Sequence, residues 1–146
     1  MDITIEHIKT TDETVYTQIR DLLIQLYPQR DPVSFNTFKQ VVENGQVRTY
    51  AAFLEEKIVG TSTLAFYKKL CGNVWIIEDV VVDETIRGKG IGKKLTDRMV
   101  ADARVGGAEI VDLTTRSEEA RRFYIEKCGF KDKADWRPFW GLRYSF

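Results

Sequence analysis

The sequence predicts a mixed α/β fold with a mostly antiparallel central sheet of about seven strands, flanked by about four helices. β-branched apolar runs typical of strands alternate with runs in which apolar residues recur at helical spacing. The longest β-branched run, Val74–Val82, is mostly apolar, so we expect a central strand that is covered on both faces. The order of elements (strand, two helices, three strands, helix, strand, helix, two strands) is that of a mixed sheet.

Each element follows from local patterning and from residues that begin or end helices. Thr11-Asp12 and Thr115-Arg116-Ser117-Glu118, which has capping-box form, are typical helix N-termini, and Gly106-Gly107 and Gly129 are typical helix ends. We expect helices near residues 12–26, 35–43, 91–105 and 118–128, and strands near 3–7, 47–54, 58–67, 74–82, 109–113, 130–133 and 139–144.

Length and composition favour a single domain spanning residues 1–146. The chain has 22 basic and 22 acidic residues, and this balance gives no general attraction to nucleic acid or to an anionic membrane. We therefore expect neither as a partner. Two cysteines and the lack of a signal-peptide-like N-terminus favour a reduced, cytoplasmic location. The oligomeric state stays open, with a homodimer as one alternative, and no cluster has metal-ligand spacing.

The strongest chemical signal is the glycine-rich turn between the central strand and the next helix. Its predicted ligand-binding residues are Arg87, Gly88, Lys89, Gly90, Ile91, Gly92 and Lys93. The first turn of a helix has unpaired amide donors and a partial positive charge, which suit phosphate oxygens. Glycines let the backbone approach such a ligand closely, and the basic residues add charge. The alternative is a turn whose glycines serve only the backbone geometry.

Two common phosphate-binding motifs do not fit this turn. A Walker A loop has four residues between its glycines and then Lys-Ser/Thr, whereas three residues separate Gly88 from Gly92, and Lys93 precedes Lys94. A dinucleotide fingerprint reads G-x-G-x-x-G, whereas this turn reads G-x-G-x-G. The sequence therefore favours another phosphate-containing ligand.

Two motifs together resemble the GNAT superfamily of acetyl-CoA-dependent N-acetyltransferases. Arg87-x-x-Gly90-x-Gly92 is similar to the family's pyrophosphate motif, and residues 120–130 are similar to its second signature, A-x-x-F-Y-x-K-x-G-F. The resemblance implies that acetyl-CoA is the acetyl donor. It also implies that two parallel strands splay apart, and that the pantetheine arm pairs with Val80, Val81 and Val82. Ser117 stands where many members have a cofactor-contacting asparagine.

Glu78 and Tyr124 are the candidate catalytic side chains, and the resemblance places Tyr124 beside the sulfur of coenzyme A. Glu78 is a carboxylate in a largely apolar run, where desolvation would raise its pKa and suit it to act as a base. It could instead face solvent or pair with a cation such as Arg116. Tyr124 would donate a proton to the departing sulfur, whereas the alternative is an aromatic core residue.

The resemblance places the acceptor between the Tyr27–Phe38 region and the C-terminal Trp136–Trp140 segment, with Asp31 and Asp135 nearby. Aromatic rings with nearby acids would suit a cationic amine. The acceptor could be a small-molecule amine or a peptide amine. A coenzyme A-binding sensor without turnover is the alternative function, and the pair Glu78 and Tyr124 argues against it because a pure binder needs neither. A nucleic-acid-associated domain is the least favoured reading, given the neutral charge.

Overall fold

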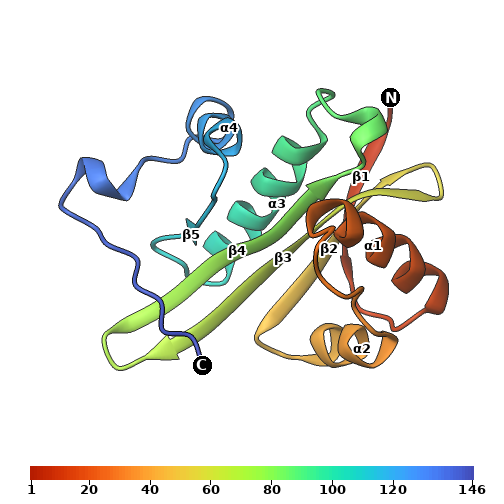
Figure 1. Ribbon diagram of the computed structural model, residues 1–146, viewed down its shortest axis with the longest axis horizontal. Coiled ribbons are helices and arrows are strands. Elements are labelled where there is room, and N and C mark those ends of the chain that lie inside the picture. The colour runs from red at the N-terminus through yellow and green to blue at the C-terminus, as the bar shows by residue number, and fades with distance from the viewer. The chain divides into compact units, whose positions relative to one another are not determined.

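A computed structural model describes all residues, 1–146, and they form two compact units, 1–114 and 115–146. The first unit contains one five-stranded sheet in the order β1-β2-β3-β4-β5 (Figure 1). Its elements are β1 (Ile3–Ile8), α1 (Glu13–Leu26), α2 (Phe35–Glu43), β2 (Val47–Leu54), β3 (Lys57–Lys69), β4 (Gly72–Val82), the 3-10 turn η1 (Glu84–Ile86), α3 (Ile91–Val105) and β5 (Asp112–Leu113). The second contains α4 (Glu118–Cys128) and the 3-10 turn η2 (Lys133–Asp135).

The sheet is mixed, as predicted. β1 to β4 pair antiparallel with their neighbours, and β4 pairs parallel with β5. The parallel pairing covers only Ile76 opposite Asp112 and Ile77 opposite Leu113. From Glu78 to Val82, β4 therefore has a strand partner on its β3 side only.

The prediction of about seven strands was wrong, because the two C-terminal strands are absent. Residues 130–132 are irregular, and Asp132 accepts a hydrogen bond from the Ala134 backbone, which favours the turn η2 over a strand. Residues 139–146 have no regular structure. Their apolar side chains are exposed, with Leu142 at 95%, so no buried face fixes a strand there.

Four α-helices are present, as predicted, and those of the first unit cover both faces of the sheet. Tyr50 and Ala51 are consecutive in β2 and point to opposite faces. Ala51 packs in a core with residues of α1 and α2, such as Leu22 and Phe38, whereas the Tyr50 hydroxyl donates to Asp102 of α3 at 2.8 Å. In Figure 1, α1 and α2 accordingly lie on one side of the sheet and α3 on the other. No helix is long and apolar enough to span a membrane.

A β-bulge interrupts β4 just after its parallel pairing ends. Thr63 lies opposite Glu78 and Thr61 lies opposite Val81, so Asp79 and Val80 together face one residue of β3. Asp79 adopts the left-handed conformation, with φ 53°, which only a few residue types tolerate. The extra residue reverses the alternation of side chains, and Val81 therefore joins the core under α1 and α2.

Candidate functional site

The glycine-rich turn leads from β4 through η1 into the N-terminus of α3. Gly88 and Gly90 have φ values of 81° and 77°, which side chains with a Cβ rarely adopt. Gly90 is the residue that precedes the helix, and it provides no side-chain cap. The other three α-helices are capped by the side chains of Asp12, Ser34 and Ser117. The first amides of α3 are thus left available to a ligand.

The basic side chains of this turn differ in what they contact. The Arg87 Nε donates to the Val82 carbonyl at 3.1 Å and so closes the turn on β4. Lys93 forms an ion pair with Asp97, one turn further along α3. Lys89 is exposed and has no carboxylate partner. The turn therefore combines open amides with local positive charge, a combination that suits an anion.

The backbone of β4 next to this turn has one open edge. Val80, Val81 and Val82 lie beyond the last residue that pairs with β5. Backbone groups at such an edge can pair with an extended ligand as they would with another strand. The Val82 carbonyl already accepts a hydrogen bond from the Arg87 side chain. The Arg87 side chain does not bind Val80 or Val81, so the backbone of these two residues is the part of the edge that a ligand could pair with.

Glu78 lies just beyond the last residue of the parallel pairing, immediately before the bulge. Its side chain is exposed and makes no hydrogen bond or ion pair within residues 1–114. Partial burial, and secondly the charge of Asp79, raise the pKa of the Glu78 carboxyl above its ordinary value. Cross-strand pairing places Glu78 opposite Thr63, and Thr63 opposite Thr49. A carboxylate and two hydroxyls therefore form a row across three strands on one face.

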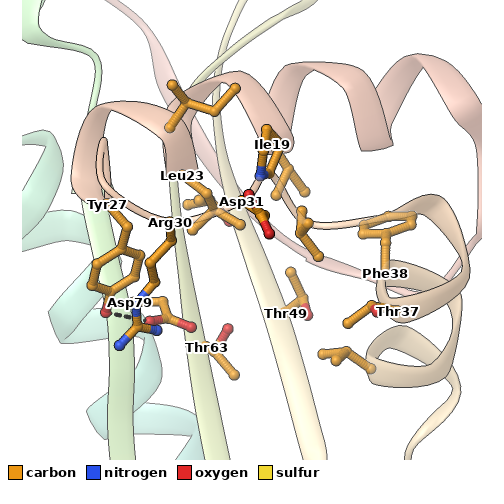
Figure 2. Close-up of a pocket in the computed structure, with 15 residues that line it drawn as sticks. Ile19, Leu23, Tyr27, Arg30, Asp31, Thr37, Phe38, Thr49, Thr63 and Asp79 are labelled. Carbon is orange, nitrogen blue, oxygen red and sulfur yellow. Dashed lines mark hydrogen bonds between the residues drawn. The ribbon is translucent and has the colours of Figure 1, made fainter.

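A pocket of about 260 Å³ opens on this face, between the sheet and helices α1 and α2 (Figure 2). It is lined by Ile19, Leu23, Ile24, Tyr27, Arg30, Asp31, Pro32, Val33, Thr37, Phe38, Val41, Thr49, Thr61, Thr63 and Asp79. The Tyr27 hydroxyl donates to Asp79 Oδ1 at 2.7 Å, and the Arg30 guanidinium carbon lies 4.5 Å from the Tyr27 ring centroid. The predicted acceptor residue Tyr27 is thus a wall of an actual pocket.

Sequence reasoning missed most of the polar residues of this pocket. Asp79 was visible as the second acid of a carboxylate pair inside an apolar run, but its orientation depends on the bulge. Thr49 and Thr63 looked like ordinary strand residues, and only the register of β2 against β3 brings them together. Arg30 follows the end of α1, inside the 27–38 region predicted for the acceptor, but no pattern singled it out within that region.

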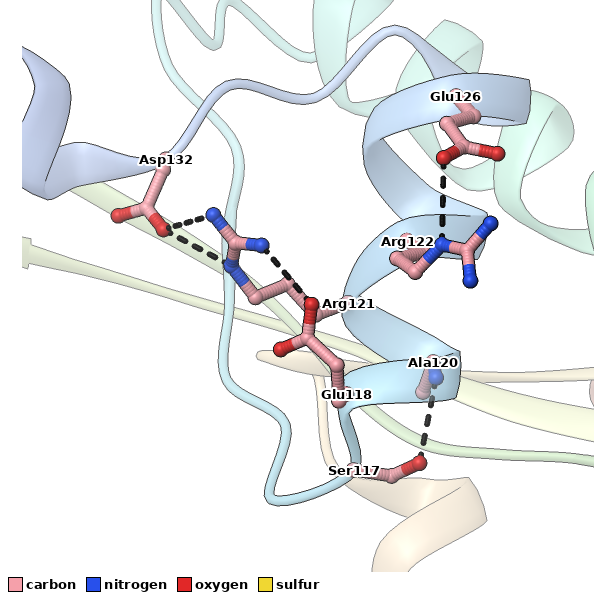
Figure 3. Close-up of polar contacts among 7 residues, drawn as sticks. All are labelled: Ser117, Glu118, Ala120, Arg121, Arg122, Glu126 and Asp132. Carbon is pink, nitrogen blue, oxygen red and sulfur yellow. Dashed lines mark hydrogen bonds and ion pairs between the residues drawn. The ribbon is translucent and has the colours of Figure 1, made fainter.

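The second unit carries the other predicted residues, Ser117, Tyr124 and Trp136. Ser117 caps α4, with its hydroxyl accepting from the Ala120 amide at 3.2 Å (Figure 3). Burial, and secondly Cys128, raise the pKa of Tyr124 to about 12. Its ring contacts the edges of Phe123 and Phe130, at centroid distances of 5.0 and 5.7 Å. Trp136 is 67% exposed.

Ion pairs join residues within α4 and connect α4 to the segment that follows it. Arg121 donates two hydrogen bonds to Asp132, at 2.9 and 3.0 Å, and a third to Glu118 at 3.2 Å (Figure 3). Arg122 pairs with Glu126 at 3.3 Å on the same helix. Both arginines of α4 therefore have carboxylate partners within this unit.

Known proteins match both units of the chain. The sequence matches the acetyltransferase (GNAT) family over residues 14–130. Glucosamine 6-phosphate N-acetyltransferase of Arabidopsis thaliana is 35% identical over 103 residues, which cover 66% of this chain and 68% of that protein. A probable glucosamine 6-phosphate N-acetyltransferase 2 of Oryza sativa subsp. japonica is 38% identical over 82 residues, which cover 54% of this chain and 48% of that protein. The chain therefore spans about half the length of the rice relative.

The fold is also that of solved structures. The crystal structure of glucosamine-6-phosphate N-acetyltransferase from Arabidopsis thaliana superposes with a TM-score of 0.79 at 28% identity, over 99% of each chain. The correspondence includes the sheet, the glycine-rich turn and the helices that border the pocket, because it extends over nearly the whole of both chains.

Proposed function

The chain belongs to the acetyltransferase (GNAT) family, and from this premise we propose that it transfers the acetyl group of acetyl-CoA directly to a primary amine in a ternary complex. It is an N-acetyltransferase, and enzymes of its family use acetyl-CoA. The donor supplies an activated acetyl thioester. The roles of the individual residues below are our proposal.

The observation that carries the proposal is the uncapped N-terminus of α3. The amides of Ile91 and Gly92 lack intrahelical partners, and Gly90 supplies no side chain to cap them. A diphosphate would accept from these amides and from the backbone of Gly88–Gly90, with Arg87 and Lys89 near the charge. The residues of the turn fit a diphosphate, because the first amides of α3 are free to donate to it. In the other α-helices of the chain, a side chain of the protein itself accepts from these amides.

The proposed chemistry needs a base, an acid and a donor for the carbonyl oxygen. Glu78 accepts, directly or through water, the proton that the acceptor ammonium must lose before its nitrogen can form the amide bond. Tyr124 donates a proton to the sulfur when the carbon–sulfur bond breaks; with a pKa of about 12 it stays protonated at neutral pH. A backbone amide near Val80, at the bulge, is the proposed donor to the carbonyl oxygen.

The pocket beside Tyr27 is the proposed acceptor site. Trp136 is also proposed to contact the acceptor. Glu78 stands in the same cross-strand row as Thr63, which lines the pocket, so a base and a binding site share one face of the sheet. Ser117 is proposed to contact the cofactor through the N-terminal region of α4. Glucosamine 6-phosphate is the first acceptor to test, because two relatives are named for it.

Two measurements test the proposal. Acetyl-CoA should raise the melting temperature by mass action, whereas NAD or ATP at the same concentration should raise it much less. Thiol release should then require an amine from a panel of glucosamine 6-phosphate, glucosamine, spermidine and a short peptide, and mass spectrometry should find the acetylated amine. Tight acetyl-CoA binding with no thiol release for any amine would favour the coenzyme A sensor instead.

A further inference from the structure

We propose that Thr49 and Thr63 bind a hydroxyl group of the acceptor, so that the substrate is a small hydroxylated amine such as an amino sugar or amino alcohol. This inference rests on the proposed function, because it takes the pocket beside Tyr27 as the acceptor site. It assigns a specificity role to two strand residues that are no part of the proposed chemistry.

The first observation is a buried hydroxyl without a partner. Thr49 is only 6% exposed, its Oγ1 makes no hydrogen bond within the protein, and it lines the pocket. Buried polar atoms in native proteins are nearly always paired, because desolvation without a compensating hydrogen bond is unfavourable. A ligand hydroxyl in the pocket would supply the missing partner.

The second observation is the register of the sheet. Thr49 lies directly opposite Thr63, and Thr63 lies directly opposite Glu78. Neighbouring strands are about 4.8 Å apart. Thr63, one strand away, therefore lies about 5 Å from the strand position of Glu78, and Thr49, two strands away, lies about 10 Å from it. An acceptor whose amine binds Glu78 and whose hydroxyl binds a threonine spans less than these distances, because each hydrogen bond itself covers about 3 Å, and this span suits a small amino sugar or amino alcohol. Polyamines and simple peptide amines have no hydroxyl to offer there.

The rest of the pocket is consistent with a small polar acceptor. Its volume of about 260 Å³ lies below the roughly 300–1,000 Å³ of sites for drug-sized ligands, so it suits a single small molecule. The third threonine of the floor, Thr61, already donates to the Tyr50 carbonyl at 2.8 Å, which leaves Thr49 and Thr63 as the hydroxyls available to a ligand. Arg30, Asp31 and Asp79 add one basic and two acidic side chains to the lining.

The strand itself provides a matched control. Ser62 is also fully buried with an unpartnered hydroxyl, but it is adjacent to Thr61 and Thr63 in β3 and therefore faces away from the pocket. The variants are Thr49→Val, Thr63→Val and, as the control, Ser62→Ala. Each removes a hydroxyl that has no recorded partner in the protein, so melting temperatures should be unchanged or higher, and folding should not obscure the kinetics.

The experiment measures steady-state constants with glucosamine and with cyclohexylamine, a ring amine of similar size that lacks hydroxyls. We expect Thr49→Val and Thr63→Val to raise KM for glucosamine about three- to tenfold, the effect of one neutral hydrogen bond, with KM for cyclohexylamine and for acetyl-CoA unchanged. Ser62→Ala should change none of these constants. Equal effects of Thr49→Val on both amines, or no effect on either, would overturn the inference, and the latter result would mean that water alone satisfies Thr49.

The outcome separates this inference from the function on which it rests. If the wild-type enzyme acetylates spermidine or cyclohexylamine and no hydroxylated amine of the panel, the acetyltransferase proposal stands and the inference fails. If the protein binds acetyl-CoA but releases thiol with no amine, the proposed function itself fails, and the inference fails with it.

Discussion

The Tyr27 hydroxyl donates a 2.7 Å hydrogen bond to Asp79 Oδ1, and this bond joins the end of α1 to the bulge of β4. Asp79 is held in a left-handed conformation that is unfavourable for most residues, so the surrounding structure must stabilise it. Burial first, and then Asp79, raise the pKa of Tyr27 to about 12, so the phenol remains a donor across the physiological range. The bond therefore fixes both a pocket wall and the strand that carries Glu78.

Replacing Tyr27 by Phe should test this link. The variant leaves Asp79 Oδ1 without its donor, and we expect a loss of about 1 kcal/mol in the free energy of unfolding, together with a higher KM for the acceptor. Urea denaturation measures the first effect. Asparagine also tolerates the left-handed backbone conformation, so Asp79→Asn serves as the second single variant. The variant with both changes completes a double-mutant cycle. Fully additive effects of the two changes would show that the bond contributes no coupling.

Gly90→Ala should weaken acetyl-CoA binding. A Cβ at Gly90 meets no atom within 4 Å, so the change acts through its positive φ and through crowding of the space next to the α3 amides. We expect a stability loss of about 1–2 kcal/mol and a higher Kd for acetyl-CoA, measured by calorimetry.

Gly107→Ala is the matched control for that change. Gly107 also has a positive φ, of 94°, and an open Cβ position, but it follows the opposite end of α3. Its backbone strain should reduce stability by a similar amount while the Kd stays unchanged. A rise in Kd of the same size for both variants would indicate general destabilisation and would remove the anion role from the turn.

Glu78→Gln should lower turnover and, at neutral pH, raise stability. The pKa of Glu78 is higher in the folded protein than its ordinary value, so the folded state holds the proton more tightly. That contribution to stability is complete at low pH and is lost as pH rises through the folded pKa. Glutamine carries no charge at any pH, so the variant does not lose this stability as the pH rises. The melting temperature of Glu78→Gln should therefore exceed that of the wild type at pH 7–8 but not at pH 4.

An exposed glutamate in η1 provides the comparison for this prediction. Glu84→Gln removes a similar charge near the same strand, and it should leave kcat unchanged. If Glu78→Gln has full activity, Glu78 is not the base, whatever its effect on stability.

Tyr124→Phe should reduce kcat with little change in acetyl-CoA affinity. The change removes only the hydroxyl, and the ring contacts with Phe123 and Phe130 remain. General acids contribute about 10²–10⁴-fold, so a loss of at least tenfold in kcat is expected. Because the pKa of Tyr124 is about 12, its ionisation should produce no fall in activity below about pH 10. Tyr144→Phe, an exposed change in the same unit, should have no effect. Full activity of Tyr124→Phe would remove it from the mechanism.

Local signals in the sequence predicted the elements that local chemistry determines. The helix N-termini at Asp12 and within residues 115–118, and the helix end at Gly129, were predicted from short residue patterns because caps and left-handed ends have strong residue preferences. The cap within 115–118 is Ser117, whereas the capping-box pattern would place it at Thr115. The glycine-rich turn was predictable for the same reason, since Gly88 and Gly90 have the positive φ values that glycine accommodates. The roles of individual site residues remain predictions that the mutants above would test.

Features that depend on pairing between distant segments were missed. The pattern of residues 139–144 suits a strand, but a strand also requires a neighbour and a buried face, and this segment has neither. The bulge at Asp79 and the row from Thr49 to Glu78 depend on the register of β3 against its neighbours, which no single segment encodes. The acceptor pocket was therefore visible in the sequence only through the Tyr27–Phe38 region, which supplies Tyr27, Asp31 and Phe38 to its lining.

The most direct test is a crystal structure of the protein with acetyl-CoA. The proposal predicts diphosphate oxygens about 2.7–3.2 Å from backbone nitrogens of Gly90, Ile91 or Gly92, with the pantetheine arm along the open edge of Val80 and Val81. Well-defined acetyl-CoA bound elsewhere, with the first amides of α3 facing only solvent, would contradict it.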